Sequence, residues 1–339
     1  MKEKLSNLTN PHPMIEIKDL TRNFGTLVAV NSLNFGVEEG EVFGLLGPNG
    51  AGKTTTLSML CTILKPTSGT AIINGVDVRH HPSQVRKMIG IVFQDPSIDD
   101  RLTGRENLEM HANLYGVPST VGKKRIDEVL GLVELEDKAD LLMRTYSGGM
   151  RRRLEIARGL IHYPKVLFLD EPTIGLDPQT REHIWTYISA LSKRESITIV
   201  LTTHYMEEAD KLCDRVAIID YGNIIALDQP ERLKEGLEGD VITVRTGSVR
   251  ELSEELRQQG LVKDLKETDG ELKLVVKNGA AIMPRIVELA TGLGVHIESM
   301  SMREPTLEDV FLHFTGREIR TEGGEEYHGL AAIKRRSIR

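Results

Sequence analysis

The stretch that decides the fold is Gly47–Thr55, which reads GPNGAGKTT and directly follows the apolar run VFGLL. Its glycines and proline exclude a regular helix or strand. The spacing fits G-x-x-x-x-G-K-[ST], a loop whose backbone N–H groups surround phosphate at the positive end of a following helix. A glycine-rich turn that binds nothing is the alternative. A strand pattern before the loop and a helical pattern after it favour phosphate binding, with Lys53 on the outer phosphates and the Thr54 hydroxyl on Mg²⁺.

The composition limits the classes of function. The chain has 339 residues, 40% of them hydrophobic, which is enough for two or three domains with a sizeable core. A net charge of −7 argues against nucleic-acid binding, which usually needs a basic surplus. Cys61 and Cys213 lie far apart without a C-x-x-C pair, so we expect neither a disulfide framework nor a zinc site, and a reducing cytosol fits.

The sequence offers no direct means of entering a membrane. Its first residues lack the apolar segment of a signal peptide, and no apolar run approaches the roughly 20 residues that cross a bilayer. We therefore expect any membrane role to come through a partner.

Most of the chain has an α/β pattern. From Met14 to about Ala226, short runs rich in β-branched residues alternate with helical stretches, which predicts a largely parallel core sheet. The pattern from about Thr103 to Met143 is helical and indicates an insert between two strands. We expect a tail at 1–13 and a nucleotide-binding domain at 14–236, with its helical subdomain at about 95–150.

The remainder of the chain has a different order of elements. Strand, helix, two strands joined by a DG pair, helix and strand predict a small α+β domain of the ferredoxin-like kind at 237–316. Residues 317–339 read as a charged tail, and a solvated end is favoured over one that rests on a partner or an anionic surface.

The stretch KVLFLDEP, Lys165–Pro172, is the second candidate for chemistry. Its apolar residues predict a buried strand, and Asp170 and Glu171 follow at the carboxyl end, where α/β sheets place ligands. Asp170 suits a contact with Mg²⁺, directly or through water, and Glu171 is placed to accept a proton from attacking water. From these residues alone, a solvated loop is an equal alternative.

The stretch TYSGGMRRRLEIARGL, Thr145–Leu160, predicts another glycine-marked helix start. Ser147, Gly148 and Gly149 would leave free N–H groups at the head of an amphipathic helix, which makes a second anion site. A plain helix cap is the alternative. The run of arginines from Arg151 to Arg153 is interpreted as a solvated helix face.

Taken together, these stretches resemble the nucleotide-binding subunit of an ATP-binding-cassette (ABC) transporter over about Met14 to Gln229. The matching pieces, in the family's order, are GPNGAGKTT, VFQD, YSGGM, VLFLDEPTIGLDP and LTTHYMEEAD. The shorter stretches LTGRENL, PTIGLDP and LEDVFL are similar to the drug-resistance exporter branch, whose cassette serves a separately encoded permease. The resemblance implies a P-loop NTPase cassette with a helical subdomain, and an ATPase that uses ATP and Mg²⁺ to power export from the cytoplasmic face of the cell membrane.

The resemblance also implies how the sites are assembled. Two copies would pair head to tail with ATP between them, and the helical subdomain would contact the permease. One copy would supply the phosphate loop and the expected catalytic residues, which are Glu171, His204 and Gln94. The other copy would supply Ser147 and Gly149 to the same γ-phosphate.

Further roles follow by position. Gln94 would sense Mg²⁺ or water, His204 would contact the γ-phosphate, and Asp177 would lie in the loop that links the two sites. Phe24 falls where the family places an aromatic ring against adenine, with a core phenylalanine as the alternative. The expected nucleotide-binding residues are Phe24, Gly47, Pro48, Asn49, Gly50, Ala51, Gly52, Lys53, Thr54, Thr55, Ser147, Gly148, Gly149 and Asp177. The expected metal ligands are Thr54, Gln94 and Asp170.

Two departures from the family and three competing functions stay open. Tyr146 and Met150 replace the leucine and glutamine of the common L-S-G-G-Q signature. Anion binding through Ser147 and the backbone should survive, whereas a contact at Met150 that a glutamine side chain would make stays open. The alternatives to an exporter subunit are a soluble ABC ATPase of translation or DNA repair, an importer subunit, and a regulator whose C-terminal domain senses a ligand. The cargo is not readable from this chain.

One further helix is predicted at the end of the small domain. Thr306 and Asp309 fit a capping box, and Gly316 suits the helix end. Leu307, Val310, Phe311 and Phe314 would form one apolar face, which either covers its own small sheet or docks on a cassette.

Overall fold

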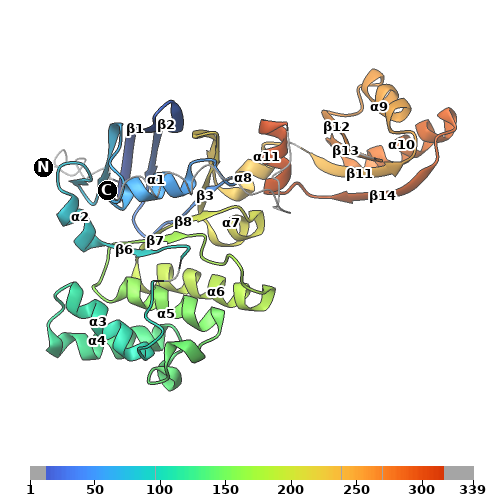
Figure 1. The fold of residues 1–339 in the computed structure, drawn as a ribbon. Coiled ribbons are helices and arrows are strands. Elements are labelled where there is room, and N and C mark those ends of the chain that lie inside the picture. The colour runs from blue at the N-terminus through green and yellow to red at the C-terminus, as the bar shows by residue number, and fades with distance from the viewer. Residues whose placement is uncertain (1–12, 96, 238, 269, 317–339) are drawn as a thin grey trace, which may run out of the picture.

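The computed structural model describes residues 13–95, 97–237, 239–268 and 270–316. These residues form three sheets with helices around them, in the predicted α/β plus α+β arrangement (Figure 1). The charged tail expected at 317–339 and residues 1–12 of the N-terminal tail lie outside the described ranges.

The central sheet has six strands in the order β10-β9-β3-β8-β7-β6. Five of them pair in parallel, and β10 joins one edge antiparallel to β9. Their bounds are β3 (Val42–Leu46), β6 (Ile89–Val92), β7 (Val166–Asp170), β8 (Thr198–Thr203), β9 (Arg215–Asp220) and β10 (Asn223–Asp228). Because β3, β8 and β7 are parallel neighbours, the residues that follow them meet at one edge of the sheet.

A second sheet in the same part of the chain is antiparallel, with the order β2-β1-β4-β5. Its strands are β1 (Ile15–Phe24), β2 (Leu27–Val37), β4 (Ser68–Ile73) and β5 (Val76–Asp77). The sequence predicts β1 and β4 as strands but not that they leave the parallel sheet, and it does not predict β2 or β10.

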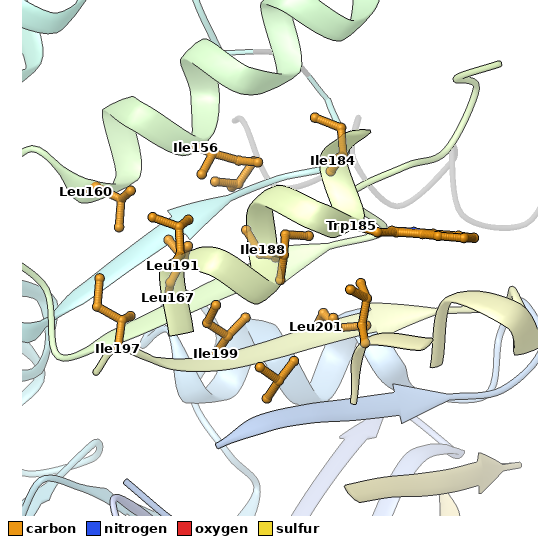
Figure 2. Close-up of a cluster of buried hydrophobic side chains, with 14 of the residues drawn as sticks. Ile156, Leu160, Leu167, Ile184, Trp185, Ile188, Leu191, Ile197, Ile199 and Leu201 are labelled. Atoms are coloured by element: carbon orange, nitrogen blue, oxygen red, sulfur yellow. The ribbon is translucent and has the colours of Figure 1, made fainter. Parts of the chain in front are cut away.

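Helices cover both faces of the central sheet. In the view of Figure 1, α1 (Lys53–Leu60) lies above it and α5 (Gly148–Leu160) and α6 (Pro178–Glu195) lie below. Figure 2 shows Ile156 of α5 and Ile188 of α6 in one buried cluster with Leu167 of β7 and Ile199 of β8. Near-continuous apolar strands such as β7 are typical of a sheet covered on both faces.

The predicted helical insert is present between β6 and β7. It holds α3 (Gly104–Leu114), α4 (Ser119–Leu132), η1 (Glu136–Lys138) and η2 (Met143–Thr145) and leads into α5. Thr103 and Glu106 form a capping box that fixes the start of α3. The remaining helices of this part of the chain are α2 (Pro82–Met88), α7 (Met206–Leu212) and α8 (Pro230–Glu235).

The C-terminal part has the predicted β-α-β-β-α-β order. Its antiparallel sheet, in the order β12-β13-β11-β14, has its own core with two helices. The elements are β11 (Asp240–Thr246), α9 (Val249–Gln258), β12 (Asp264–Thr268), β13 (Glu271–Val276), α10 (Gly279–Leu293) and β14 (Ile297–Arg303). This order is that of a ferredoxin-like domain.

The last helix, α11 (Leu307–Thr315), connects the two parts (Figure 1). Leu307, Val310 and Phe311 belong to the same buried cluster as Leu212 of α7 and side chains of α5 and α6. The interpretation that this face covers the small sheet is therefore wrong, because it packs on the nucleotide-binding part of its own chain. Phe314 was predicted on the same face but is 54% exposed.

The opposite side of α11 touches the small sheet. Lys266 donates to the carbonyl of Leu312, and His313 Nδ1 lies 3.2 Å from a carboxylate oxygen of Asp264. The helix thus has contacts on both sides. None of the helices in the described ranges has both the length and the hydropathy needed to cross a bilayer.

Candidate nucleotide site

The phosphate loop runs from the end of β3 into α1. A Cβ atom on Gly47 would lie 2.2 Å from the carbonyl oxygen of Ile219, so only glycine fits there. Gly52 has φ 106°, and a Cβ atom on it would lie 2.5 Å from the carbonyl oxygen of Ala29. Both glycines therefore let the loop pass close to backbone of neighbouring strands. Pro48, Asn49, Gly50, Ala51 and Thr55 complete the loop and the first turn of α1.

Lys53 is buried and points back along this loop. Its Nζ donates to the carbonyl oxygens of Gly47, at 2.7 Å, and of Pro48, at 3.1 Å, and lies 3.6 Å from Glu171 Oε1. Burial lowers the pKa of Lys53, while the nearby Glu171 and Asp170 carboxylates act in the opposite direction. The loop thus holds an amine where an entering anion would meet it.

Asp170 and Thr54 form the candidate metal site. Thr54 Oγ1 donates to Asp170 Oδ1 at 3.1 Å, and Thr202 Oγ1 donates to the same oxygen at 2.5 Å. Mg²⁺ prefers oxygen ligands and usually binds through one or two protein groups, several waters and substrate phosphates. A carboxylate and a hydroxyl beside the phosphate loop fit that ion. Gln94 is exposed two residues beyond β6, the neighbour of β7 in the sheet.

Glu171 and His204 meet on the other side of Lys53. His204 Nδ1 lies 3.2 Å from Glu171 Oε1, which is an ion-pair distance. Burial acts to raise the pKa of Glu171, but the contacts with His204 and Lys53 outweigh it and hold that pKa below its ordinary value. The carboxylate is therefore ionised and able to accept a proton.

Phe24 lies at the end of β1, where the chain turns into β2. It is 39% exposed, so the interpretation of Phe24 as a core residue is wrong. The Arg22 guanidinium lies 4.6 Å from the ring centroid, and the apolar Leu27 and Val28 are exposed on the same hairpin. Strand β2 also approaches the loop at Gly52, which places this apolar surface next to the loop.

The predicted second anion site lies at the start of α5. Ser147 Oγ caps the helix by accepting a hydrogen bond from the N–H of Met150 at 3.3 Å. A Cβ atom on Gly149 would lie 2.4 Å from the Cγ2 methyl of Thr180 of α6, so a larger residue there would force the threonine to shift. Within the described part of the chain, no hydrogen bond or ion pair joins Ser147, Gly148 or Gly149 to the phosphate loop.

The neighbouring residues of this region have structural contacts. Asp177 is exposed and caps α6 through the N–H of Thr180 at 3.0 Å. Tyr146 is buried, and its hydroxyl donates to the carbonyl oxygen of Lys138 at 2.7 Å. The tyrosine that departs from the family signature thus joins α5 to the helical insert.

The interpretation of Arg151 to Arg153 as a solvated helix face is wrong for Arg152. That residue is 7% exposed, and its guanidinium faces the backbone between β7 and α6. The spacing of Arg152 and Glu155, three residues apart on a helix, was the one sequence signal for a buried pair. Because three arginines follow one another, the sequence alone did not distinguish the buried arginine from the two that are more exposed.

The comparisons with known proteins agree with this geometry. A family model described as ABC transporter matches residues 30–174, and one described as ATP-binding protein DrrA1-3-like, C-terminal domain matches residues 229–315. A daunorubicin resistance ATP-binding protein of Streptomyces coeruleorubidus is 39% identical over 92% of this chain and 97% of its own. A Nod factor export ATP-binding protein of Ralstonia nicotianae is 39% identical over 91% of this chain and 95% of its own.

The fold is also similar to that of solved cassettes. A dimeric ATP-binding cassette, solved in a post-hydrolysis state with ADP and Pi, superposes with a TM-score of 0.57 at 28% identity. The match covers 64% of this chain and 98% of the other. It corresponds in length to the part of the chain that carries the phosphate loop.

Proposed function

Since the chain belongs to the ABC transporter family and is an ATP-binding, ATP-hydrolysing subunit, we propose that it powers export through a separate membrane permease. The observation that carries the ATPase is the meeting of Lys53, Asp170, Glu171 and His204 beside the phosphate loop. The direction of transport rests on relatives whose names describe resistance and export.

The chemistry can be assigned to side chains of this chain. The loop N–H groups and Lys53 bind the phosphates, and Phe24 stacks on adenine. Asp170, Thr54 and Gln94 would hold Mg²⁺, which supplies positive charge to the phosphates when bound. Glu171 accepts the proton of attacking water, and His204 contacts the γ-phosphate.

A second copy completes the site. Ser147, Gly148 and Gly149 lie at the head of α5 and are not bonded to the loop of their own chain among the described residues, so they are free to face the nucleotide of a partner. Asp177 would link the two sites. A similar cassette was solved as a dimer, which supports this head-to-tail pairing.

The helical insert offers a surface for the permease. An open depression of about 530 Å³ lies along α3, and Met110 and Leu114 on it are 42% and 74% exposed. Its lining residues are Leu102, Glu106, Glu109, Met110, Asn113 and Leu114. Apolar and acidic groups together suit an amphipathic basic segment at the cytoplasmic side of the permease, which would place this subunit at that face of the membrane.

The competing functions receive less support. An importer subunit would more often carry a small β-barrel after the cassette, whereas this chain has a β-α-β-β-α-β sheet. For a soluble ATPase of translation or DNA repair, the sequence lacks the usual second phosphate loop and the zinc-binding cysteines. The third alternative is a regulator whose C-terminal domain senses a ligand, and binding of a ligand to that part of the chain would favour it.

The test co-expresses the chain with candidate permeases from its gene neighbourhood and follows ATP-dependent accumulation of candidate cargo in inside-out vesicles. Lys53→Ala should abolish both accumulation and ATP hydrolysis, because the cation that offsets phosphate charge is lost. Accumulation that continues with Lys53→Ala would reject the proposal.

A second test addresses the permease surface. Leu114→Asp should lose co-purification with the permease while the isolated subunit keeps its ATPase rate. Leu293→Asp, at a leucine that is 42% exposed on α10, is the matched control and should co-purify normally. Equal co-purification of both variants would remove α3 from the interface.

A further inference from the structure

We propose that Arg152 is a positioning residue of the ATP site, which holds the backbone on both sides of Gln94 and Glu171 and ties it to helix α5. The inference rests on the proposed function only in that Gln94 and Glu171 act on ATP. Neither the family resemblance nor the motif residues assign a role to Arg152.

The guanidinium of Arg152 is surrounded by backbone carbonyls from two loops. Nε donates to the carbonyl oxygen of Pro172 at 2.8 Å, and Nη2 donates to those of Asp170 at 3.0 Å and Glu171 at 3.2 Å. Nη1 donates to the carbonyl oxygen of Phe93 at 2.6 Å. One side chain thus joins the segment after β7 to the residue directly before Gln94.

Glu155 extends this clamp to the far side of Gln94. It is 2% exposed, and its Oε2 accepts from Arg152 Nη1 at 2.9 Å. Its Oε1 accepts from the N–H of Ser97 at 3.0 Å. The Arg152–Glu155 pair therefore holds residues 93 and 97, which flank the exposed Gln94, from a single helix.

The backbone of Glu171 needs such support. Its φ of 46° lies in the left-handed region, which a residue with a Cβ atom adopts only when its surroundings enforce it. Its N–H donates to Thr202 Oγ1 at 3.0 Å and its carbonyl accepts from Arg152, so it is held from both ends. Removing one of these contacts releases the carboxylate from its place beside Lys53 and His204.

Arginine is required at this position for a geometric reason. Its planar fork presents five donors, whereas lysine offers one compact ammonium group. Lysine keeps the positive charge opposite Glu155 but cannot reach the four carbonyls together. Arg152→Lys therefore separates the positioning role from simple compensation of a buried charge.

The position of Arg152 also connects two functions of α5. The helix begins after Ser147, which we assign to the nucleotide of the partner copy. Five residues later, Arg152 holds the carbonyls of Glu171 and of Phe93, the residue before Gln94. A movement of α5 on ATP binding would reach both groups through one rigid turn of helix.

The experiment compares Arg152→Lys with Arg151→Lys and Arg153→Lys, matched controls on the same helix turn. Arg151 pairs with the exposed Asp100 and donates to the carbonyl oxygen of Tyr146. Arg153 contacts the end of α4. Neither side chain bonds to the segments that hold Gln94 and Glu171. Arg152→Lys should lower kcat by about tenfold or more, with KM for ATP and Kd for metal-free ADP changed less than about threefold. Both controls should keep the wild-type kcat.

Hydrogen exchange supplies a readout that does not depend on turnover. The amides of residues 93–95, 97, 170 and 171 should exchange faster in Arg152→Lys, while those of the loop, residues 47 and 49–55, stay unchanged. A purely structural role would instead lower the melting temperature and speed exchange throughout the core, without a separation of kcat from KM.

A second variant guards against misfolding. Arg152→Met with Glu155→Gln removes both charges, so no unpaired buried charge remains. It should show the same loss of kcat with nucleotide binding retained. Wild-type kcat in either variant, or a loss confined to KM, overturns the inference while the ATPase stands. ATP hydrolysis that survives Lys53→Ala overturns the proposed function and the inference with it.

Discussion

At the scale of single residues, the site depends on where each charge is placed. Lys53 and His204 both lie within 3.6 Å of Glu171 Oε1, and they keep that carboxylate ionised although it is buried. Asp170, one residue earlier, accepts hydrogen bonds from the hydroxyls of Thr54 and Thr202. Adjacent carboxylates thus have different surroundings, one suited to a proton and one to a metal ion.

The first prediction concerns the proton acceptor. Glu171→Gln keeps the shape of the side chain but cannot take the proton, so ATP hydrolysis should slow by about 10²–10⁴-fold. It also removes a negative charge near the γ-phosphate, so an ATP-bound dimer should persist. Single-turnover hydrolysis and size-exclusion chromatography with Mg²⁺-ATP measure the two effects.

The control for this variant is Glu182→Gln, at an exposed carboxylate on α6. It should hydrolyse ATP and elute like the wild type. A Glu171→Gln protein that hydrolyses at the wild-type rate and stays monomeric would show that another group accepts the proton.

The sequence predicted the residues of the nucleotide-site motifs, but not the residue that holds their backbone in place. Lys53, Asp170 and Glu171 were predictable because glycine spacing and strand ends determine where they lie in any α/β sheet. Arg152 was not, because all of its partners except Glu155 are backbone carbonyls, which leave no trace in the sequence. A polar residue that binds backbone is identified only once the fold has brought that backbone to it.

At the scale of elements, the missed strands have a local cause. Strand β2 is interrupted by register shifts against β1, and Ser32 has φ 48°, so its apolar residues do not alternate regularly. Strand β10 follows a tight turn in which Tyr221 and Gly222 both have positive φ, as in hairpins. Tyrosine is not a typical turn residue, so the sequence pattern did not predict this turn. The DG pair in the sequence before β13, by contrast, is a typical turn signal.

The second prediction concerns helix α11. Phe311 is 1% exposed within the main core, so Phe311→Ala should lower the free energy of unfolding by about 3–5 kcal/mol. Phe314→Ala, at a ring that is 54% exposed, should change it by less than about 0.5 kcal/mol. Urea unfolding followed by the fluorescence of Trp185, the single tryptophan, reports on that core. Equal midpoints would mean that α11 does not pack as described.

A third prediction follows from the cap of the same helix. Asp309 accepts hydrogen bonds from Thr306 and pairs with Arg303 at 2.9 Å. Burial acts to raise the pKa of Asp309, but these contacts outweigh it and hold the pKa below its ordinary value of 3.8. The carboxylate therefore stabilises the fold fully above that value, and the stabilisation is lost as the pH falls through the lower folded-state pKa.

The matching measurement compares wild type with Asp309→Asn. At pH 7 the variant should be less stable by about 1–2 kcal/mol, since a charge-assisted hydrogen bond and a partly exposed ion pair are lost. The difference should shrink below about pH 4, where the wild-type carboxyl begins to protonate. A difference that is constant from pH 7 to pH 3 would rule out the charge as its source.

At the scale of the whole molecule, the two halves of the proposed site belong to different elements of one chain. The phosphate loop follows β3, while Ser147 starts the helix that leaves the insert (Figure 1). Among the described residues, no hydrogen bond or ion pair joins the two. The ferredoxin-like part is tied to α7 and α8 through α11, so removing it together with α11 would expose buried apolar residues such as Leu212 of α7. A lower ATPase rate after truncation of the C-terminal part could therefore come either from weaker pairing of two copies or from a less stable fold.

Complementation tests the pairing without that difficulty. A Ser147→Arg chain should be inactive alone, because a large cation at the head of α5 blocks the partner's nucleotide, and a Lys53→Ala chain should be inactive because it cannot hold the phosphates. In a mixed dimer, the intact loop of the first chain meets the intact Ser147 of the second, which restores one of the two sites. Mixing the chains should therefore recover part of the ATPase rate. The control mixes Lys53→Ala with a chain that carries both substitutions, which leaves no complete site and should stay inactive. If the first mixture stays inactive although differently tagged chains are shown to co-purify, each chain must build its site alone and the head-to-tail arrangement is wrong.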